Sequence, residues 1–147
     1  MVALSKLLHE GSFIEMSAKD KDAALRELAF ALAAEEGMPP ADRLLSAVLE
    51  REALHSTGIC LGLAIPHCRL PEIRTFAMVL GRAREGIPYE SMDNLPVRVV
   101  AMIAAPEGRQ EDYLRLLSRV TKFLKHERER ILSAPSERDL YPLVAEY

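Results

Sequence analysis

The sequence predicts a single α/β domain, in which helices pack on a central sheet. The run from Val97 to Ala105 is almost entirely apolar, as expected for a strand buried on both faces. Segments with apolar residues at helical spacing lie on either side of it. The chain has 147 residues, of which 49% are hydrophobic, and no repeat or low-complexity linker divides it. We therefore expect one domain over residues 1–147, with helices alternating with central strands.

A short strand and a helix are expected first. Phe13–Met16 has the composition of a short strand. Ser17 and Asp20 resemble a capping box, with Asp in place of Glu. The helix that follows is expected from about Lys21 to Glu36, with Gly37 as its stop. Its apolar face comprises Ala24, Leu25, Leu28, Ala29 and Leu32.

A second helix and a glycine-containing loop are expected next. Met38–Asp42 is typical of a helix start, and the helix is expected to reach about Leu54. Its buried face is supplied by Leu44, Leu45, Val48 and Leu49. The loop around Gly58 and Gly62 then ends at His67.

Two central strands follow in the prediction. Phe76–Ala83 is expected to be a strand, and Arg84–Pro88 a turn. The apolar run Val97–Ala105 is the second strand, and Pro106–Gly108 marks its end.

Helices are expected to complete the chain. Leucine, valine and tyrosine recur at helical spacing from Glu111 to about Glu127, which predicts a long helix. Ser136 and Asp139 are expected to cap a last helix that buries Leu140 and Val144.

Composition argues against several classes of partner and cofactor. The net charge is -3, and no block of Lys and Arg is typical of a nucleic-acid or membrane surface. No apolar run approaches the roughly 20 residues that span a bilayer, and residues 1–8 lack the pattern of a signal peptide. No phosphate-loop or dinucleotide fingerprint is present, so no cofactor is expected. Two cysteines are too few for a disulfide framework, which favours a cytoplasmic protein.

His67 is the strongest candidate for chemistry. An imidazole changes charge near neutral pH, and here it follows a proline that fixes the backbone. Arg51 could bind phosphoryl oxygens with a guanidinium fork. Ser56, Thr57 and the backbone N–H groups between Gly58 and Gly62 could complete an anion-binding loop. This combination indicates a histidine that handles a phosphoryl group, although a structural histidine after proline fits the pattern alone as well.

Two other chemistries involve the same segment. Cys60, His67 and Cys68 are residue types that bind zinc, but their spacing is not that of a zinc site, so no metal is expected. A cysteine nucleophile, Cys60 or Cys68, with His67 or His55 as its base is also conceivable. Small, buried cysteines are the commoner explanation.

Two segments carry a resemblance to a known family. The run Arg51-Glu52…Ser56-Thr57-Gly58-Ile59-Cys60-Leu61-Gly62-Leu63-Ala64-Ile65-Pro66-His67-Cys68 closely resembles the phosphohistidine signature of phosphotransferase-system enzyme IIA domains. The match is to the fructose/mannitol type and its nitrogen-regulatory branch. Met92–Pro106 resembles the strand that follows the family's D-N-x-P-V element. The order of elements fits from about Leu4 to the C-terminus.

The resemblance implies a fold and a function. It implies a mixed five-stranded sheet with helices on both faces. It also implies that an HPr-type phosphocarrier protein phosphorylates His67, with Arg51 as the active-site cation. The group then passes to a IIB domain in sugar uptake, or its presence controls binding to a regulated target protein. The chain would then be a phosphotransferase-type carrier with His67 as the phosphoacceptor.

The sequence departs from the family at the second active-site histidine, where Tyr113-Leu114 stands in place of His-Leu. A tyrosine hydroxyl donates one hydrogen bond but cannot become cationic. Cys60 and Cys68 replace small residues that are usual in the loop. The alternative function is therefore a regulatory protein-binding module with reduced or no phosphotransfer. The sequence leaves a homodimer open.

Overall fold

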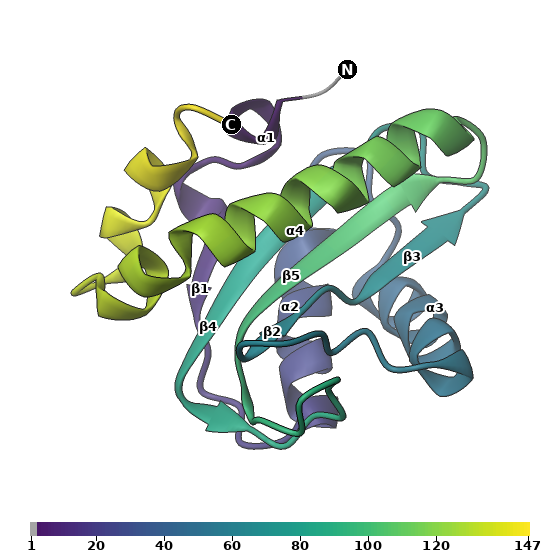
Figure 1. Ribbon diagram of the computed structural model, residues 1–147. Coiled ribbons are helices and arrows are strands. Elements are labelled where there is room, and N and C mark those ends of the chain that lie inside the picture. Colours follow the sequence, from purple (N-terminus) through teal and green to yellow (C-terminus); the bar gives the residue numbers. More distant parts are fainter. Residues whose placement is uncertain (1–2) are drawn as a thin grey trace.

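The computed structural model describes residues 3–147, and Figure 1 shows their arrangement. In chain order the helices and strands are α1 (Leu4–Leu7), β1 (Phe13–Glu15), α2 (Lys21–Ala33), α3 (Ala41–Leu54), β2 (Leu63–Ala64), β3 (His67–Leu70), β4 (Ala77–Ile87), β5 (Val97–Pro106) and α4 (Gln110–Ser133). The helices and strands do not alternate one by one as expected, because α2 and α3 are followed by four successive strands. Three 3₁₀ helices complete the set: η1 (Glu10–Ser12), η2 (Glu137–Asp139) and η3 (Tyr141–Val144).

The sheet is mixed and has five strands in the order β1-β4-β5-β2, with β3 also paired to β5. β4 and β5 are antiparallel, and β1 runs parallel to β4. β2 and β3 both run parallel to β5, and they pair with successive parts of it, at Val99–Val100 and at Ile103–Pro106. Ile65 and Pro66 separate them, so the two short strands lie along one edge of β5.

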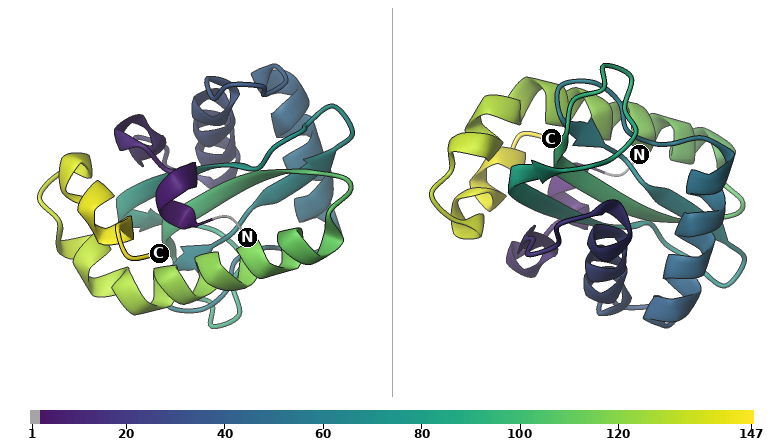
Figure 2. Two further views of the ribbon diagram at one scale, coloured as in Figure 1. Left: turned by 90° about the horizontal axis from the view of Figure 1, so that it is seen from above. Right: turned by 90° about the horizontal axis from the view of Figure 1, so that it is seen from below.

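Helices cover both faces of the sheet, with α4 on one side and α2 and α3 on the other (Figure 2). β5 supplies apolar residues to both cores, because successive side chains of a strand point to opposite faces. Val97, Val100, Met102 and Ala104 lie in the core with α2 and α3. Val99, Ala101, Ile103 and Ala105 lie in the core with α4. This two-sided burial explains why the run is almost entirely apolar, with Arg98 as the exception, and it confirms the predicted fold class.

The main predicted elements are present, some with different ends. The first strand, the helix ending at Leu54 and the strand beginning at Val97 lie where they were expected. α2 ends earlier than predicted, at Ala33, although Gly37 adopts the left-handed φ of +80°. α4 continues beyond the predicted Glu127 to Ser133, because Ile131 still packs in the core.

Several local predictions were wrong. Asp20, and not Ser17, caps α2, since its carboxylate accepts a hydrogen bond of 2.8 Å from the backbone N–H of Ala23. Residues 84–88 are not a turn, because β4 continues to Ile87 with an irregularity after Arg82. The segment before His67 is not all loop, since it contains β2. Ser136 and Asp139 do form a capping box, but they begin a 3₁₀ helix.

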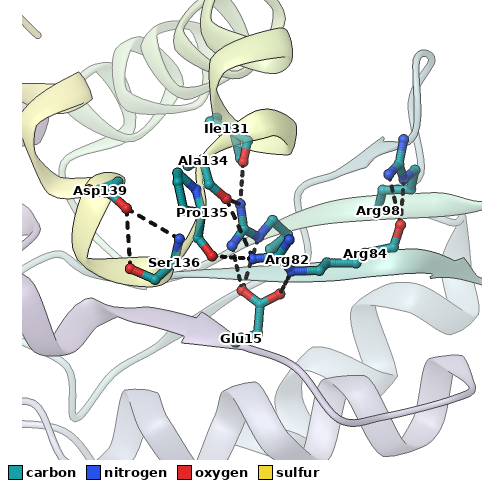
Figure 3. Close-up of polar contacts among 9 residues, drawn as sticks. All are labelled: Glu15, Arg82, Arg84, Arg98, Ile131, Ala134, Pro135, Ser136 and Asp139. Atoms are coloured by element: carbon teal, nitrogen blue, oxygen red, sulfur yellow. Dashed lines mark hydrogen bonds and ion pairs between the residues drawn. The ribbon is translucent and has the colours of Figure 1, made fainter.

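A buried arginine joins the C-terminal end of α4 to the sheet (Figure 3). Arg82 is fully buried, and its Nε and Nη2 atoms lie 2.9 and 2.7 Å from Oε2 of Glu15. Its Nη1 donates to the carbonyls of Ile131 and Ala134, at 2.6 and 2.8 Å. Arg84 binds the other oxygen of Glu15, at 2.6 Å. We call Glu15, Arg82 and Arg84 the arginine clamp.

None of the helices within residues 3–147 has both the length and the apolarity that crossing a membrane requires.

Candidate functional site

His67 is the first residue of β3 and lies opposite Ile103 of β5. The preceding Pro66 accepts a hydrogen bond of 3.0 Å from the N–H of Ile103, so the backbone is fixed on both sides of the bend between β2 and β3. The residue is 8% exposed. A buried backbone and a nearly buried ring leave the imidazole little freedom to move.

The hydrogen bonding of His67 determines which ring nitrogen is available. Nδ1 lies 2.9 Å from the carbonyl oxygen of Ile65. A carbonyl can only accept, so Nδ1 carries the proton in the neutral ring and Nε2 keeps its lone pair. Nε2 makes no hydrogen bond to any residue between 3 and 147.

Electrostatics favour the neutral form of this ring. Burial lowers the pKa of His67 from its ordinary value, and the positive charges of Arg51 and Arg69 lower it further. The hydrogen bond to Ile65 and the negative charge of Glu52 act in the opposite direction on that pKa. The net result is a neutral imidazole at neutral pH, which is the form that acts as a nucleophile.

Arg51 and Glu52 are neighbours in the last turn of α3, but their side chains have different partners. Arg51 is half-buried, and its Nη1 donates to the carbonyl of His55 at 2.6 Å. It forms no ion pair with a carboxylate of residues 3–147. Glu52 is buried, and its Oε1 lies 3.0 Å from Nζ of Lys21. Arg51 therefore keeps donors for a ligand, whereas Glu52 is already paired.

The hydroxyl groups of Ser56 and Thr57 are engaged inside the protein. Oγ of Ser56 donates to the carbonyl of Glu90 at 2.6 Å. Oγ1 of Thr57 donates to the carboxylate of Glu52, which also accepts a hydrogen bond of 3.2 Å from the Thr57 N–H. The same Oγ1 lies 3.0 Å from the hydroxyl of Tyr89. These contacts fix the loop to α3 and to the segment after β4. A direct role in phosphoryl binding stays a prediction for both residues.

The two glycines of the loop are required by its path. A Cβ on Gly58 would lie 2.1 Å from the carbonyl oxygen of Glu90, so only glycine permits this approach. Gly62 has a φ of +75°, in the left-handed region that favours glycine. Several loop N–H groups are also engaged: Gly58 donates to Oγ of Ser56, Ile59 to the carbonyl of Leu63, and Leu61 to the carboxylate of Asp93. Anion binding by this backbone therefore also stays a prediction.

Tyr113, from the first turns of α4, lies beside His67. The two ring centroids are 5.8 Å apart, with an angle of 61° between the ring planes. Tyr113 is 8% exposed, and burial raises the pKa of its hydroxyl, so it remains protonated at neutral pH. The structure thus brings His67 and Tyr113 together from distant parts of the chain.

Two further residues of the site were not singled out from the sequence. Glu52 holds Thr57, and its place directly after Arg51 in the signature was a signal that could have found it. Arg69 lies with Cζ 4.5 Å from the centroid of the Tyr113 ring. No local pattern indicates this contact, because it depends on how β3 and α4 meet.

The cysteine and metal alternatives gain no support from the geometry. Cys68 is buried on the side of α2 and α3, and burial raises the pKa of its thiol to about 12. Its thiolate is therefore not available as a nucleophile at neutral pH. Within residues 3–147 no group of three or more His, Cys, Asp or Glu side chains is placed to hold a metal ion.

A cleft of about 580 Å³ lies on the far side of the loop and is not lined by His67. Its walls come from the start of α2, the end of α3 and the segment after β4, and they include Lys21, Glu52, Ser56 and Glu90. Burial disfavours the charge of Lys21, but the hydrogen bonds that its ammonium group donates to Glu90 and Glu52 outweigh this effect and raise the pKa of the amine. The cleft is thus bordered by the ion pairs that support the loop.

The site thus combines a buried histidine on a mixed sheet with two arginines, Arg51 and Arg69, that form no ion pair with a carboxylate of residues 3–147. Comparison with known proteins identifies the family. Residues 6–147 match the family model for the phosphoenolpyruvate-dependent sugar phosphotransferase system, EIIA 2. The chain belongs to this family.

Three similar proteins represent different branches. The chain is 32% identical to the fructose-specific EIIABC component of Bacillus subtilis over 91% of its own length and 21% of that protein's length. The crystal structure of nitrogen regulatory protein IIA-Ntr from Neisseria meningitidis has a TM-score of 0.88 at 22% identity, over 97% of this chain and 99% of that one. Enzyme IIA for mannitol from Escherichia coli, in a complex with phosphorylated enzyme IIB, has a TM-score of 0.79 at 22% identity. The match covers 95% of this chain and 98% of that one. Both structural matches show the same fold.

Proposed function

We propose that the protein is a phosphocarrier that accepts a phosphoryl group on Nε2 of His67 from an HPr-type protein. The main support for this proposal is the hydrogen bonding and the lowered pKa of His67 in a chain of the EIIA 2 family. Nδ1 is committed to the Ile65 carbonyl, Nε2 keeps its lone pair, and burial with two nearby arginines holds the pKa low.

The transfer needs little from the protein beyond position and charge. The lone pair of Nε2 attacks phosphorus, a new N–P bond forms, and the bond from phosphorus to the donor breaks as the donor keeps its electron pair. The proton on Nδ1 stays where the Ile65 carbonyl holds it. Arg51 is proposed to bind the phosphoryl oxygens, since its guanidinium group has no carboxylate partner among residues 3–147.

The proposed recipient is a IIB domain or a regulated target protein. Both kinds of recipient have support among the similar proteins. One of these is a mannitol IIA in complex with phosphorylated IIB, and another is a nitrogen regulatory protein. Two free cysteines fit a reducing compartment, and we propose the cytoplasm.

The test is phosphorylation with phosphoenolpyruvate, enzyme I and an HPr-type protein, followed by intact-mass measurement. We expect one acid-labile phosphoryl group on the native chain and none on His67→Ala. His126→Ala is the matched control, since His126 is exposed, and it should accept one group like the native chain. A label that persists in His67→Ala would remove His67 as the acceptor.

A further inference from the structure

Arg69 shares one face of β3 with His67. Residues two apart on a strand point to the same side, with their Cα atoms about 6.6 Å apart. The alternate residues Cys68 and Leu70 pack in the core with α2 and α3. His67 and Arg69 therefore face the other way, toward α4, and Tyr113 of that helix contacts both side chains.

The guanidinium group of Arg69 is held in place without being neutralised. It lies over the ring of Tyr113, with Cζ 4.5 Å from the centroid. Nη2 donates to the carbonyl of Glu107 at 2.5 Å, and Nε lies 3.5 Å from the carbonyl of Pro106. Neither contact is with a carboxylate, so the full positive charge remains next to His67.

The remaining donor of this group is free. Nη1 of Arg69 makes no hydrogen bond to any of residues 3–147, and the side chain is only half-buried. Its charge reaches the imidazole, because it contributes to the lowered pKa of His67. Arg109 gives a useful contrast: it also lies over an aromatic ring, that of Phe76, but it is paired with Asp112 at 3.1 Å.

We propose that Arg69, held over the ring of Tyr113, is a second phosphoryl-binding cation beside Arg51. This inference rests on the proposed function, because it concerns the phosphoryl group on His67. It gives Tyr113 a role as a positioning residue through the face of its ring, and not through its hydroxyl. The attraction between a cation and an aromatic face favours one position of a flexible arginine.

The first experiment compares rates of phosphorylation by rapid quench. Arg69→Ala should slow phosphorylation about ten- to a hundredfold, the range for losing one charge-assisted contact in the transition state. Tyr113→Phe keeps the ring and should stay within about twofold of the native rate, whereas Tyr113→Leu should approach the rate of Arg69→Ala. The double variant Arg69→Ala/Tyr113→Leu should be no slower than Arg69→Ala, since both changes remove the same interaction. Arg109→Asn removes a nearby paired cation and should leave the rate unchanged.

The second measurement does not depend on phosphorylation. The pKa of His67, followed by NMR, should rise in Arg69→Ala and stay unchanged in Arg109→Asn, because the charge of Arg69 lowers this pKa whereas Arg109 is paired with Asp112. Thermal unfolding checks that each variant is folded.

The outcomes separate this inference from the proposed function. If the native chain is phosphorylated and Arg69→Ala reacts at the same rate, the inference is wrong and the proposed function stands. If Tyr113→Phe is as slow as Tyr113→Leu, the hydroxyl is the active group and the positioning role is wrong. If the native chain is not phosphorylated at all, both proposals fall.

Discussion

Arginines serve opposite purposes at the two ends of α4. At the C-terminal end Arg82 is fully buried, and it donates to the Glu15 carboxylate and to the carbonyls of Ile131 and Ala134. At the N-terminal end Arg69 is half-buried, and within residues 3–147 its side chain donates to two backbone carbonyls and lies over the ring of Tyr113. Tyr113 and Ile131, the α4 residues at these two contacts, are about 27 Å apart along the helix axis, at 1.5 Å per residue.

These arginines differ in the partners of their N–H groups. A buried charge is tolerated only when its hydrogen bonds are made, and the arginine clamp meets this condition with a carboxylate and with carbonyls at the negative end of a helix. Near His67, Arg51 and Arg69 are half-buried and form no ion pair with a carboxylate of residues 3–147. Arginines of the first kind stabilise the fold, and we propose that arginines of the second kind bind the phosphoryl group.

The largest expected effect concerns the arginine clamp. Arg82→Met should lower the free energy of unfolding by about 3 kcal/mol, because it leaves buried carbonyls unpaired and half of the Glu15 interaction unmade. The measurement is urea unfolding followed by circular dichroism. At urea concentrations below its unfolding transition, this variant should still be phosphorylated at close to the native rate. A variant as stable as the native chain would contradict the structural role of the clamp.

Arg51→Lys should show the opposite behaviour. Lysine keeps the charge but loses the fork that binds two oxygens, so phosphorylation should slow about ten- to a hundredfold, or roughly 1.4–3 kcal/mol in the barrier. The free energy of unfolding should change by no more than about 0.5 kcal/mol. Rapid-quench rates and urea unfolding on the same samples test both statements. Unchanged kinetics with an intact fold would make Arg51 an ordinary residue at a helix end.

These contrasts also show what the sequence could predict. The strand after Pro96 was found because burial on both faces makes it apolar except for Arg98, which is a local signal. The end of β4, from Arg84 to Ile87, was missed, since Arg84, Glu85 and Gly86 resemble a polar turn when their partners are unknown. The partners of Arg82 are Glu15 and the end of α4, which are far away in the chain. Buried polar residues of this kind are explained only by long-range contacts.

The residues of the site also fall into those that the sequence indicates and those that only long-range contacts reveal. His67 and Arg51 lie within one continuous signature, so both were named from the sequence as candidates. The contact of Arg69 with Tyr113 joins β3 to α4, and no spacing in the sequence indicates it. The expectation that Ser56 and Thr57 bind the phosphoryl group treated their hydroxyls as free, whereas the structure pairs them with Glu90 and Glu52.

The smallest expected effect is the pH dependence of stability at His67. Burial lowers the pKa of this residue in the folded chain, so the unfolded chain binds more protons as the pH falls below about 6.5. The native chain should therefore lose more stability than His67→Gln between pH 7.5 and pH 5.5. Urea unfolding at several pH values measures the difference. Parallel curves for the two proteins would mean that burial does not depress this pKa.

The central claim, that Nε2 of His67 carries the phosphoryl group, is tested most directly by NMR of the phosphorylated chain. Phosphorus coupling to the ring of ¹⁵N-labelled protein distinguishes the two nitrogens. The structure predicts a single phosphohistidine on Nε2, with Nδ1 still protonated and bonded to the carbonyl of Ile65. A phosphoryl group on Nδ1, or on any residue other than His67, would contradict the account.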